Sequence, residues 1–519
     1  IYIEKIFVLK YVYLLIMNKK IILTVDSSTS SSTTMVWDVK GNLVFKTSKK
    51  IKLYTPKTGY YEQNAKEWIQ SLIDNLKKIS LKFLSYKILS ICITNQRETF
   101  VPVDQKGKPL RPAITWLDER CKKEVDSFPK TIGLKKIHQI TGKNIDIIPS
   151  IYKIVWIKNN EKKIFYKTYK FLDVQSYLVW FLTNKFKTSW ASSDSSGLFD
   201  VKKKRWSKVI LKKLGLDENN FPESHKPGSI VGHLTLKASK ITGLKKDIPV
   251  MVGGGDGQSA FMGTVCNFDN SAFLNLGTSV NSGIFSQKYF FDKSCKTSLS
   301  LDNKGYILEN PIKAGTFSID WYLNNILKLK KIKNYKKFEK KIKNSSIRKT
   351  GLFFTPYLLG AMGPYWDSNA RGILIGISGN TSQLDIYRSI MESIVLEQIF
   401  TLNIVLKKIN KRIKKIIAVG GGAKSNLWCQ MFANISGLNI ERPRNSEGTS
   451  LGIAILSLTN LGYYNSYKTA ANLILKKQKK TIFVPDKKEI IFSRKLLNLY
   501  SKIYLQNKSI LNEIKEIRD

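Results

Sequence analysis

Two apolar segments of this chain end in turns of Ser, Gly and Thr, residue types that can hold a phosphate. Residues 21–30 read IILTVDSSTS, and residues 272–279 read AFLNLGTS. Turns of this kind expose backbone N–H groups and hydroxyls at the end of a strand, where an anion can bind. Only the first segment carries an acid at the strand end, Asp26, which can face a metal ion or its bound waters. The two segments predict a duplicated domain that holds the phosphates of a magnesium nucleotide between two hairpins.

Three further predicted strands deliver polar side chains to one edge of a sheet. The strands cover residues 88–94, 113–116 and 248–255, and they lead into Asn95-Gln96-Arg97-Glu98-Thr99, Leu117-Asp118-Glu119-Arg120 and Asp256-Gly257-Gln258. Polar clusters just past strand ends mark the ligand edge of an open α/β sheet. Glycines flank Asp256, so this carboxylate can approach a small hydroxylated ligand and take its proton. The alternative is that Asp256 only caps the helix that follows.

A glycine turn between a strand and a helix is the third element of a nucleotide site. The apolar residues 415–419 run into Gly420-Gly421-Gly422-Ala423, and a helix begins near Asn426, while a longer helix over residues 382–406 precedes the strand. Glycines allow close backbone approach, and a helix N-terminus favours anions. The P-loop pattern is absent, and the glycines can equally serve close packing of the strand against the helix.

The length and charge of the chain restrict the class of protein. Its 519 residues suit two domains of about 250 residues each, with a boundary near residues 263–267. The formal charge is +47, but only 12 of the 86 basic residues are Arg, the residue that reads bases and phosphates bidentately. We therefore expect no specific nucleic-acid partner. The five Cys form no C-x-x-C pair and the three His are scattered, so neither a zinc site nor a disulfide framework is predicted.

The first sixteen residues, IYIEKIFVLKYVYLLI, resemble a signal segment only in part. Charged residues interrupt the apolar run, and no small-residue cleavage site follows. We expect residues 1–16 to be an extension without function and Met17 to be the biological start, with an interfacial helix as the alternative. No later stretch approaches the roughly 20 apolar residues of a membrane span. A soluble cytoplasmic protein without a membrane partner is predicted.

Taken together, the motifs of this chain resemble those of the FGGY carbohydrate kinases, a family that includes glycerol kinase, xylulokinase and ribulokinase. The resemblance covers residues 18–486, and the motifs follow the family's order and spacing. They are VDSSTS (25–30), ITNQRET (93–99), AITWLDER (113–120), SIYKIVWIKN (150–159), GGGDGQSAFMG (253–263), LGTS (276–279), GPYWDSNARG (363–372), MESIVLEQ (391–398) and VGGGAKSN (419–426). Each motif is weak alone, and the ordered set is specific.

The resemblance implies an α/β fold of two ribonuclease-H-like domains, of the actin, hexokinase and Hsp70 type, around a catalytic cleft. Residues 17–264 would form the sugar-binding domain and residues 265–519 the ATP-binding domain, and the chain would form a homodimer or homotetramer. ATP and Mg²⁺ would be the cofactors. Asp256 would be the catalytic base and Asp26 the acid near Mg²⁺. The implied nucleotide contacts are Ser28, Thr29, Ser30, Gly277 and Thr278 for the phosphates, and Gly422, Ala423 and Asn426 for the adenosine.

The implied substrate contacts are Arg97, Glu98, Trp116, Asp256 and Gln258. An adjacent cation and anion can clamp vicinal hydroxyls, because each hydroxyl both donates and accepts hydrogen bonds, and Trp116 can supply an apolar wall. The alternatives are a surface ion pair and a core indole. The Arg-Glu pair resembles glycerol kinase, whereas WLDER resembles the W-x-D-x-R of pentulokinases.

Four positions depart from the family pattern. Ile148 and Asn281 stand where glycerol kinases have a substrate-contacting Tyr and a Phe, which weakens an assignment to glycerol. Ser28 replaces the Gly of D-x-G-T, and Thr33 replaces a basic residue near the phosphates. Lys153, the other lysines or the metal are candidates to supply the missing positive charge.

The leading hypothesis is an ATP- and Mg²⁺-dependent kinase of a small polyhydroxylated substrate, with a ketopentose such as xylulose favoured over glycerol. A glycerol kinase is the first alternative. A nucleotide-binding regulator that has lost catalysis is the second. The presence of Asp26, Asp256, Arg97 and Glu98 together favours an active enzyme.

Overall fold

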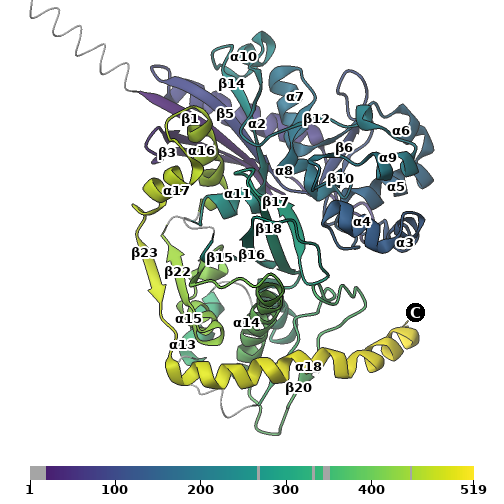
Figure 1. The fold of residues 1–519 in the computed structure, drawn as a ribbon, viewed down its shortest axis with the longest axis vertical. Coiled ribbons are helices and arrows are strands. Elements are labelled where there is room, and N and C mark those ends of the chain that lie inside the picture. The colour runs from purple at the N-terminus through teal and green to yellow at the C-terminus, as the bar shows by residue number, and fades with distance from the viewer. Residues whose placement is uncertain (1–18, 266–268, 330–332, 343–350, 445–446, 519) are drawn as a thin grey trace, which may run out of the picture.

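Two lobes lie one above the other in the computed structural model, each built around its own sheet (Figure 1). The structure describes residues 19–265, 269–329, 333–342, 351–444 and 447–518. The predicted extension, residues 1–16, and Met17 lie outside the described residues. The long C-terminal helix runs along the far end of the second lobe (Figure 1).

The first lobe contains a six-stranded sheet. Its strand order is β13 (Ile230–His233), β14 (Pro249–Gly255), β5 (Lys87–Asn95), β1 (Lys20–Ser27), β2 (Ser31–Asp38) and β3 (Leu43–Lys50). β1, β5 and β14 are parallel, and β1, β2 and β3 form an antiparallel meander. Both faces of the parallel strands are buried, so Ile91 and Cys92, which point to opposite faces, are both 0% exposed.

The second lobe contains a seven-stranded sheet. Its order is β17 (Lys296–Leu299), β18 (Tyr306–Ile312), β16 (Val280–Ser286), β15 (Ser271–Leu276), β21 (Lys415–Val419), β22 (Asn439–Pro443) and β23 (Lys480–Phe483). The arrangement repeats that of the first lobe. β15, β16 and β18 form an antiparallel meander, β21 and β22 pair in parallel on the other side of β15, and β23 pairs antiparallel at that edge. The predicted duplication and the two ribonuclease-H-like α/β domains are confirmed, and β17 is an addition at one edge.

Two of the three polar strand ends meet at one edge of the first sheet. β5 and β14 are neighbours, and Gly255 is in register with Asn95, so Arg97 and Asp256 follow adjacent strands. The expectation that residues 113–116 belong to the same sheet is wrong. β7 (Ala113–Ile114) pairs instead in a four-stranded sheet with β4 (Glu62–Gln63), β6 (Phe100–Val103) and β8 (Lys170–Asp173).

The two helices predicted in the second half of the sequence form with small shifts at their ends. They are α14 (Gln383–Lys408), which begins at a capping box on Ser382, and α15 (Asn426–Ser436). In the first lobe, α2 (Ala65–Lys82) follows β4. The remaining helices are α3 (Lys122–Ser127), α4 (Leu134–Thr141), α5 (Ser150–Asn160), α6 (Lys162–Lys167), α7 (Val174–Thr183), α8 (Trp190–Ser193), α9 (Lys208–Leu214), α10 (Leu236–Thr242), α11 (Asp256–Met262), α12 (Thr316–Trp321), α13 (Lys333–Ile342), α16 (Gly448–Asn460), α17 (Tyr467–Leu475) and α18 (Lys487–Arg518). Short strands complete the fold: β9 (Lys187–Ser189), β10 (Phe199–Asp200), β11 (Arg205–Trp206), β12 (Glu223–His225), β19 (Phe353–Phe354) and β20 (Leu374–Ile375).

α16 and α17 come from the second half of the sequence but pack on the first lobe, beside β1 and β3 (Figure 1). Leu451 and Ile453 share a core with Cys92 and Met251 of the first sheet. The predicted division between residues 264 and 265 did not include this return of the chain. The second half of the sequence therefore supplies helices to both lobes.

α14 is long and apolar enough, by length and composition, to cross a membrane, contrary to the expectation that no such stretch follows the first sixteen residues. However, 72% of its most apolar window is buried inside the protein. Ile390, Ile394 and Val405 of this helix lie in the core of the second lobe. α14 is therefore a core helix of that lobe.

The crossing of α11 and α16 yields a prediction about stability. A Cβ atom on Gly452 of α16 would overlap the carbonyl group of Ser259 in α11. We expect Gly452→Ala to lower the free energy of unfolding by about 2 kcal/mol or more, because the helices must separate, although Ala alone favours a helix over Gly by about 1 kcal/mol. Thermal unfolding measures the effect. Gly379→Ala, at a site with open space, is the control, and equal melting temperatures for both variants would contradict the packing argument.

Candidate active site

Asp256 is the first residue of α11 and follows β14 directly. Its Oδ1 accepts the N–H of its neighbour Gly257 at 2.8 Å and lies 3.4 Å from Nε of Arg97. The alternative role as a helix N-cap is wrong, because Gly255 occupies that position and makes no side-chain capping bond. Since 44% of the Asp256 side chain is accessible, a ligand can reach the carboxylate.

The surroundings raise the pKa of Asp256 above the ordinary Asp value of 3.8. Partial loss of hydration is the main cause, because more than half of the side chain is covered; the charge of Arg97 lowers the pKa, and that of Glu98 raises it further. A raised pKa brings a carboxylate closer to the value that suits a general base near neutral pH. The geometry and the electrostatics of Asp256 are therefore those expected of a proton acceptor.

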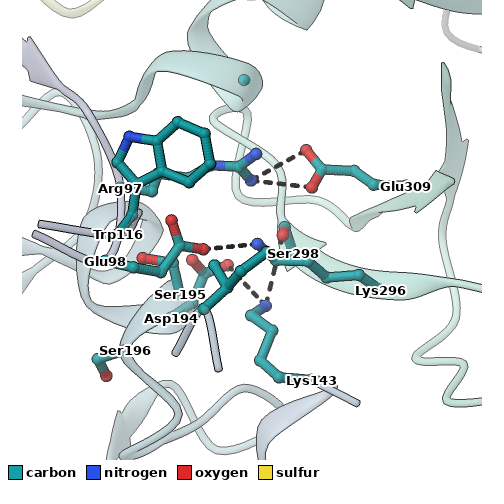
Figure 2. Close-up of polar contacts among 12 residues, drawn as sticks. Arg97, Glu98, Trp116, Lys143, Asp194, Ser195, Ser196, Lys296, Ser298 and Glu309 are labelled. Atoms are coloured by element: carbon teal, nitrogen blue, oxygen red, sulfur yellow. Dashed lines mark hydrogen bonds and ion pairs between the residues drawn. The ribbon is translucent and has the colours of Figure 1, made fainter. Parts of the chain in front are cut away.

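Arg97 follows β5 and reaches across to the second sheet (Figure 2). Its Nη1 donates to both carboxylate oxygens of Glu309 on β18, at 3.0 and 2.9 Å. A Cβ atom on Gly255 or Gly257 would lie less than 3.0 Å from the Arg97 side chain. The glycines that flank Asp256 therefore make room for the guanidinium group.

Glu98 also pairs with the second sheet rather than with its neighbour in sequence. Its carboxylate accepts a hydrogen bond from Nζ of Lys296 on β17 at 2.5 Å. The backbone of Glu98 has a φ of 60°, which is uncommon for a residue other than Gly, and its carbonyl accepts the Ser150 hydroxyl at 2.9 Å. The side chains of Arg97 and Glu98 are only 13% and 6% exposed, so the alternative of a surface ion pair is wrong.

Trp116 reaches the first hairpin rather than the core. Its half-buried indole donates from Nε1 to Oγ1 of Thr29 at 2.9 Å, and Thr29 donates in turn to Oε1 of Gln96 at 2.9 Å. The Thr29 hydroxyl, predicted to contact a phosphate, thus links the turn to Trp116. It lies on the border between the predicted substrate and phosphate regions.

The charged residues of the WLDER segment have structural partners. Asp118 is fully buried and accepts Nε of Arg120 at 2.8 Å and the N–H of Tyr61 at 2.7 Å. The Arg120 guanidinium stacks on the ring of Tyr60 at 4.1 Å. Trp116 is therefore the member of this motif whose contacts lead toward the site.

Gln258 is fully buried, so the predicted contact between its side chain and a substrate is absent from this arrangement. Its Nε2 donates to the carbonyl of Ala191 at 2.8 Å and to Asp194 at 3.1 Å. Asp194 is itself buried and lies 3.9 Å from Nζ of Lys143 (Figure 2). Gln258 packs beneath the site and holds Asp194.

Asp26 lies near the end of β1, opposite Thr33 on β2. Its Oδ1 is buried without a hydrogen-bond partner, so this oxygen does not form an Asx turn with the serines that follow. Burial, followed by repulsion from Asp256 and Glu447, raises the pKa of Asp26 to about 7, while Lys46 lowers it. An unsatisfied carboxylate under repulsion is a fitting neighbour for a cation.

The donors around Asp26 fit Mg²⁺ bound to a nucleotide better than a cation held by protein alone. Mg²⁺ in such sites usually takes one or two carboxylates and keeps waters and phosphate oxygens as its other ligands. Among the described residues there is no group of three or more His, Cys, Asp or Glu that could hold a metal. Asp26 would face the ion or its waters.

The two predicted phosphate turns occupy equivalent places in the two sheets. In the first, the N–H and hydroxyl of Ser28 both donate to the carbonyl of Ser31 at 2.9 Å. Ser28 is not among the residues with positive φ, so its replacement of Gly causes no backbone strain. Ser30 in the first turn and Thr278 in the second are both exposed.

The residues of the glycine turn in the second lobe differ in packing and accessibility. Gly420 has a φ of 91°, a conformation that favours Gly, and a Cβ atom on Gly422 would overlap the ring of Trp428. Backbone conformation therefore explains the first Gly, and close packing explains the second. Gly421 faces open space, and Asn426 is exposed as the first residue of α15. Ala423 is 2% exposed, which leaves Gly421 and Asn426 accessible to an adenosine.

Lys153 does not supply the charge that Thr33 lacks. It is fully buried, and its Nζ donates to the carbonyls of Ile147 and Ile148 at 2.7 Å each. Lys46 on β3 is instead the cation that acts on Asp26, and its Nζ lies 2.6 Å from Oε1 of Glu447.

Two sequence-family models together cover most of the chain. The N-terminal domain model of the FGGY family of carbohydrate kinases matches residues 21–263, and the C-terminal domain model matches residues 272–461. The chain belongs to this family. It is thus a carbohydrate kinase, an enzyme that phosphorylates a sugar hydroxyl, as the motifs predicted.

Individual relatives of this FGGY protein carry different substrate names. A xylulose kinase of Staphylococcus xylosus is 28% identical over 486 residues, which are 93% of this chain and 99% of the relative. A glycerol kinase of Saccharolobus islandicus is 29% identical over 474 residues, 88% of this chain and 91% of the relative. A crystal structure of xylulose kinase from Lactobacillus acidophilus, 22% identical, has a TM-score of 0.88 and covers 95% of this chain and 100% of its own. The last comparison confirms the fold.

The environment of Asp26 yields a prediction about metal dependence. We expect Asp26→Asn to raise the Mg²⁺ concentration for half-maximal kinase activity by about 10- to 100-fold, because the charge that faces the ion is lost. The melting temperature should stay equal or rise, since the substitution removes an unfavourable buried charge. Asp74→Asn, at a surface pair with Lys49, is the control. An unchanged Mg²⁺ requirement would contradict the assignment of Asp26.

Proposed function

We propose that this protein transfers the γ-phosphoryl group of ATP, in the presence of Mg²⁺, to a hydroxyl of a ketopentose such as xylulose. The observation that carries the proposal is the placement of Asp256, Arg97 and Asp26 at the ends of three neighbouring strands, β14, β5 and β1, along one sheet edge. Phosphoryl transfer depends on a proton acceptor, positive charge and metal placement rather than on covalent help from the protein. These three side chains supply those parts.

In the proposed reaction, the substrate hydroxyl oxygen bonds to the γ-phosphorus while the bond to the bridging oxygen of ADP breaks. Asp256 accepts the hydroxyl proton, and its raised pKa suits that task. Arg97, held by Glu309, fixes the orientation of Asp256, and Glu98 accepts hydrogen bonds from other hydroxyls of the substrate. Bound ATP supplies the phosphoryl group, with Mg²⁺ near Asp26 neutralising its phosphates.

The choice of a ketopentose over glycerol depends on two half-buried side chains, Ile148 and Asn281. Oδ1 of Asn281 is buried without a hydrogen-bond partner, and a sugar with additional hydroxyls can satisfy it. The similarity to xylulose kinase also spans more of this chain than the similarity to glycerol kinase. Glycerol is the second candidate, favoured by the Arg97-Glu98 pair.

The proposal includes the setting of the reaction. We place it in the cytoplasm, since Cys92, Cys121, Cys295 and Cys429 are free and buried thiols that fit a reducing compartment. ATP and the sugar are the proposed partners. We expect a homodimer or homotetramer, which sedimentation of the purified chain measures.

Replacement of Asp256 tests the proposed base. Asp256→Asn keeps the size of the side chain but removes the proton acceptor, so kcat should fall by about 10² to 10⁴. ATP affinity and melting temperature should stay nearly unchanged, because the loss concerns the transition state. Near-normal turnover at saturating substrate would assign the base to another residue.

A substrate panel tests the choice of sugar. Coupled ADP-release assays with xylulose, ribulose, erythritol and glycerol should give the highest kcat/KM with a ketopentose. In the double variant Ile148→Tyr with Asn281→Phe, kcat/KM for glycerol should rise about tenfold, equivalent to about 1.4 kcal/mol of transition-state binding, because both changes add apolar contact to a three-carbon backbone. A wild-type protein that prefers glycerol would contradict the ketopentose proposal but not the assignment as a kinase.

A further inference from the structure

Two ion pairs join the substrate residues of the first lobe to the second lobe. Arg97 pairs with Glu309 of β18, and Glu98 pairs with Lys296 of β17, as Figure 2 shows. Neither Glu309 nor Lys296 belongs to a motif that pointed to the site. Both pairs are nearly buried, with side-chain exposures of 13% and 3% for the first and 13% and 6% for the second.

The pKa values of Glu309 and Arg97 both depend on the charges of their neighbours. Burial alone would raise the pKa of Glu309, but the charges of Arg97 and Lys296 hold it below its ordinary value. The pKa of Arg97 is raised because Glu309, Glu98 and Asp256 together outweigh the loss of hydration. A nearly buried charge without its partner is strongly unfavourable, so each pair constrains the side chains that form it.

The first lobe offers these two side chains few other partners. Within its own lobe, Arg97 has one ion-pair contact among the described residues, the 3.4 Å approach of its Nε to Asp256. The Glu98 carboxylate has Lys296 as its hydrogen-bond donor, while the contact with Ser150 goes to the Glu98 backbone. The positions of both side chains are therefore determined from the second sheet.

We propose that Glu309 and Lys296 are positioning residues for substrate recognition, which set Arg97 and Glu98 in place only when the two lobes are in contact. This inference rests on the proposed function, because it takes Arg97 and Glu98 as substrate-binding groups. It makes sugar affinity depend on two side chains of the second lobe, which also carries the turns at Thr278 and Gly421. Through Arg97, Glu309 also orients Asp256.

The chain contains a matched ion pair for comparison. Nζ of Lys313, one residue after β18, lies 3.0 Å from Asp146 of the first lobe, with exposures of 15% and 11%. This pair also joins the two lobes and is similarly buried, but it contacts neither Arg97 nor Glu98. Lys313→Met therefore reports what the loss of a cross-lobe ion pair does by itself.

The first measurement needs no substrate. Phenylglyoxal labelling of Arg97, followed by peptide mass mapping, compares the wild type with Glu309→Gln and Lys313→Met. We expect Glu309→Gln to raise the rate of Arg97 labelling about threefold or more, because the guanidinium loses its charged partner, and Lys313→Met to leave the rate unchanged. Equal rates in both variants, or no change in either, would overturn the inference.

The second measurement separates positioning from stability. With the preferred sugar, Lys296→Met should raise KM about tenfold or more with a smaller change in kcat, since a misplaced Glu98 weakens binding of the substrate, and Lys296→Arg should restore part of the loss. Lys313→Met should leave KM unchanged, and an equal rise there would overturn the inference. If thermal unfolding shows that Lys296→Met does not fold, the KM of Lys296→Arg and the labelling rates of Arg97 test the inference instead. A wild-type protein that phosphorylates no sugar would contradict the proposed function. The labelling of Arg97 would still test whether Glu309 positions that side chain.

Discussion

Charge pairing across the boundary between the lobes is the constraint on which the site depends. Arg97, Glu98 and Asp256 extend from the first sheet, and Glu309 and Lys296 from the second. Such groups lose hydration when the lobes meet, and a low-polarity environment makes any unpaired charge among them unfavourable. The arrangement satisfies the charges in pairs while leaving much of the Asp256 carboxylate accessible. Asp256 thus stays open to a ligand, while Arg97 and Glu98 beside it are each held by a partner from the second sheet.

Local patterns in the sequence were sufficient to predict the central strands of the two large sheets, the two hairpins and the place of Asp256, but not the separate sheet that contains β7. Apolar strands that end in small polar turns depend on neighbouring residues, so β1, β15 and β21 follow from their own sequence. Glu309 and Lys296 could not be found in this way, because 212 and 198 residues separate them from Arg97 and Glu98. One signal was present. A Glu within an apolar strand, as in YILENPI, needs a charged or hydrogen-bonding partner once it is buried.

The difference between residues that the fold requires and residues that face the ligand explains why the sequence evidence on the substrate is divided. The segment WLDER resembles the corresponding motif of pentulokinases in sequence, but Asp118 and Arg120 bind each other and the neighbouring backbone. Their types are required by a buried ion pair and an aromatic stack, so they carry information about the scaffold rather than about a sugar. The proposed choice of substrate depends instead on side chains of a second kind, Ile148 and Asn281, and Oδ1 of Asn281 is buried without a partner from the scaffold. Residues of this second kind are few, and no short motif contains them.

The return of α16 and α17 to the first lobe has a consequence for synthesis of the chain on the ribosome. The first sheet is complete once residue 255 has been made, yet one of its faces is covered by Leu451, Ile453 and their neighbours. At about 5–20 residues per second, those helices are made tens of seconds later. Until then, the part of this apolar sheet face that α16 covers is exposed in the nascent chain. Newly made protein therefore passes through a stage at which a chaperone has a defined surface to bind.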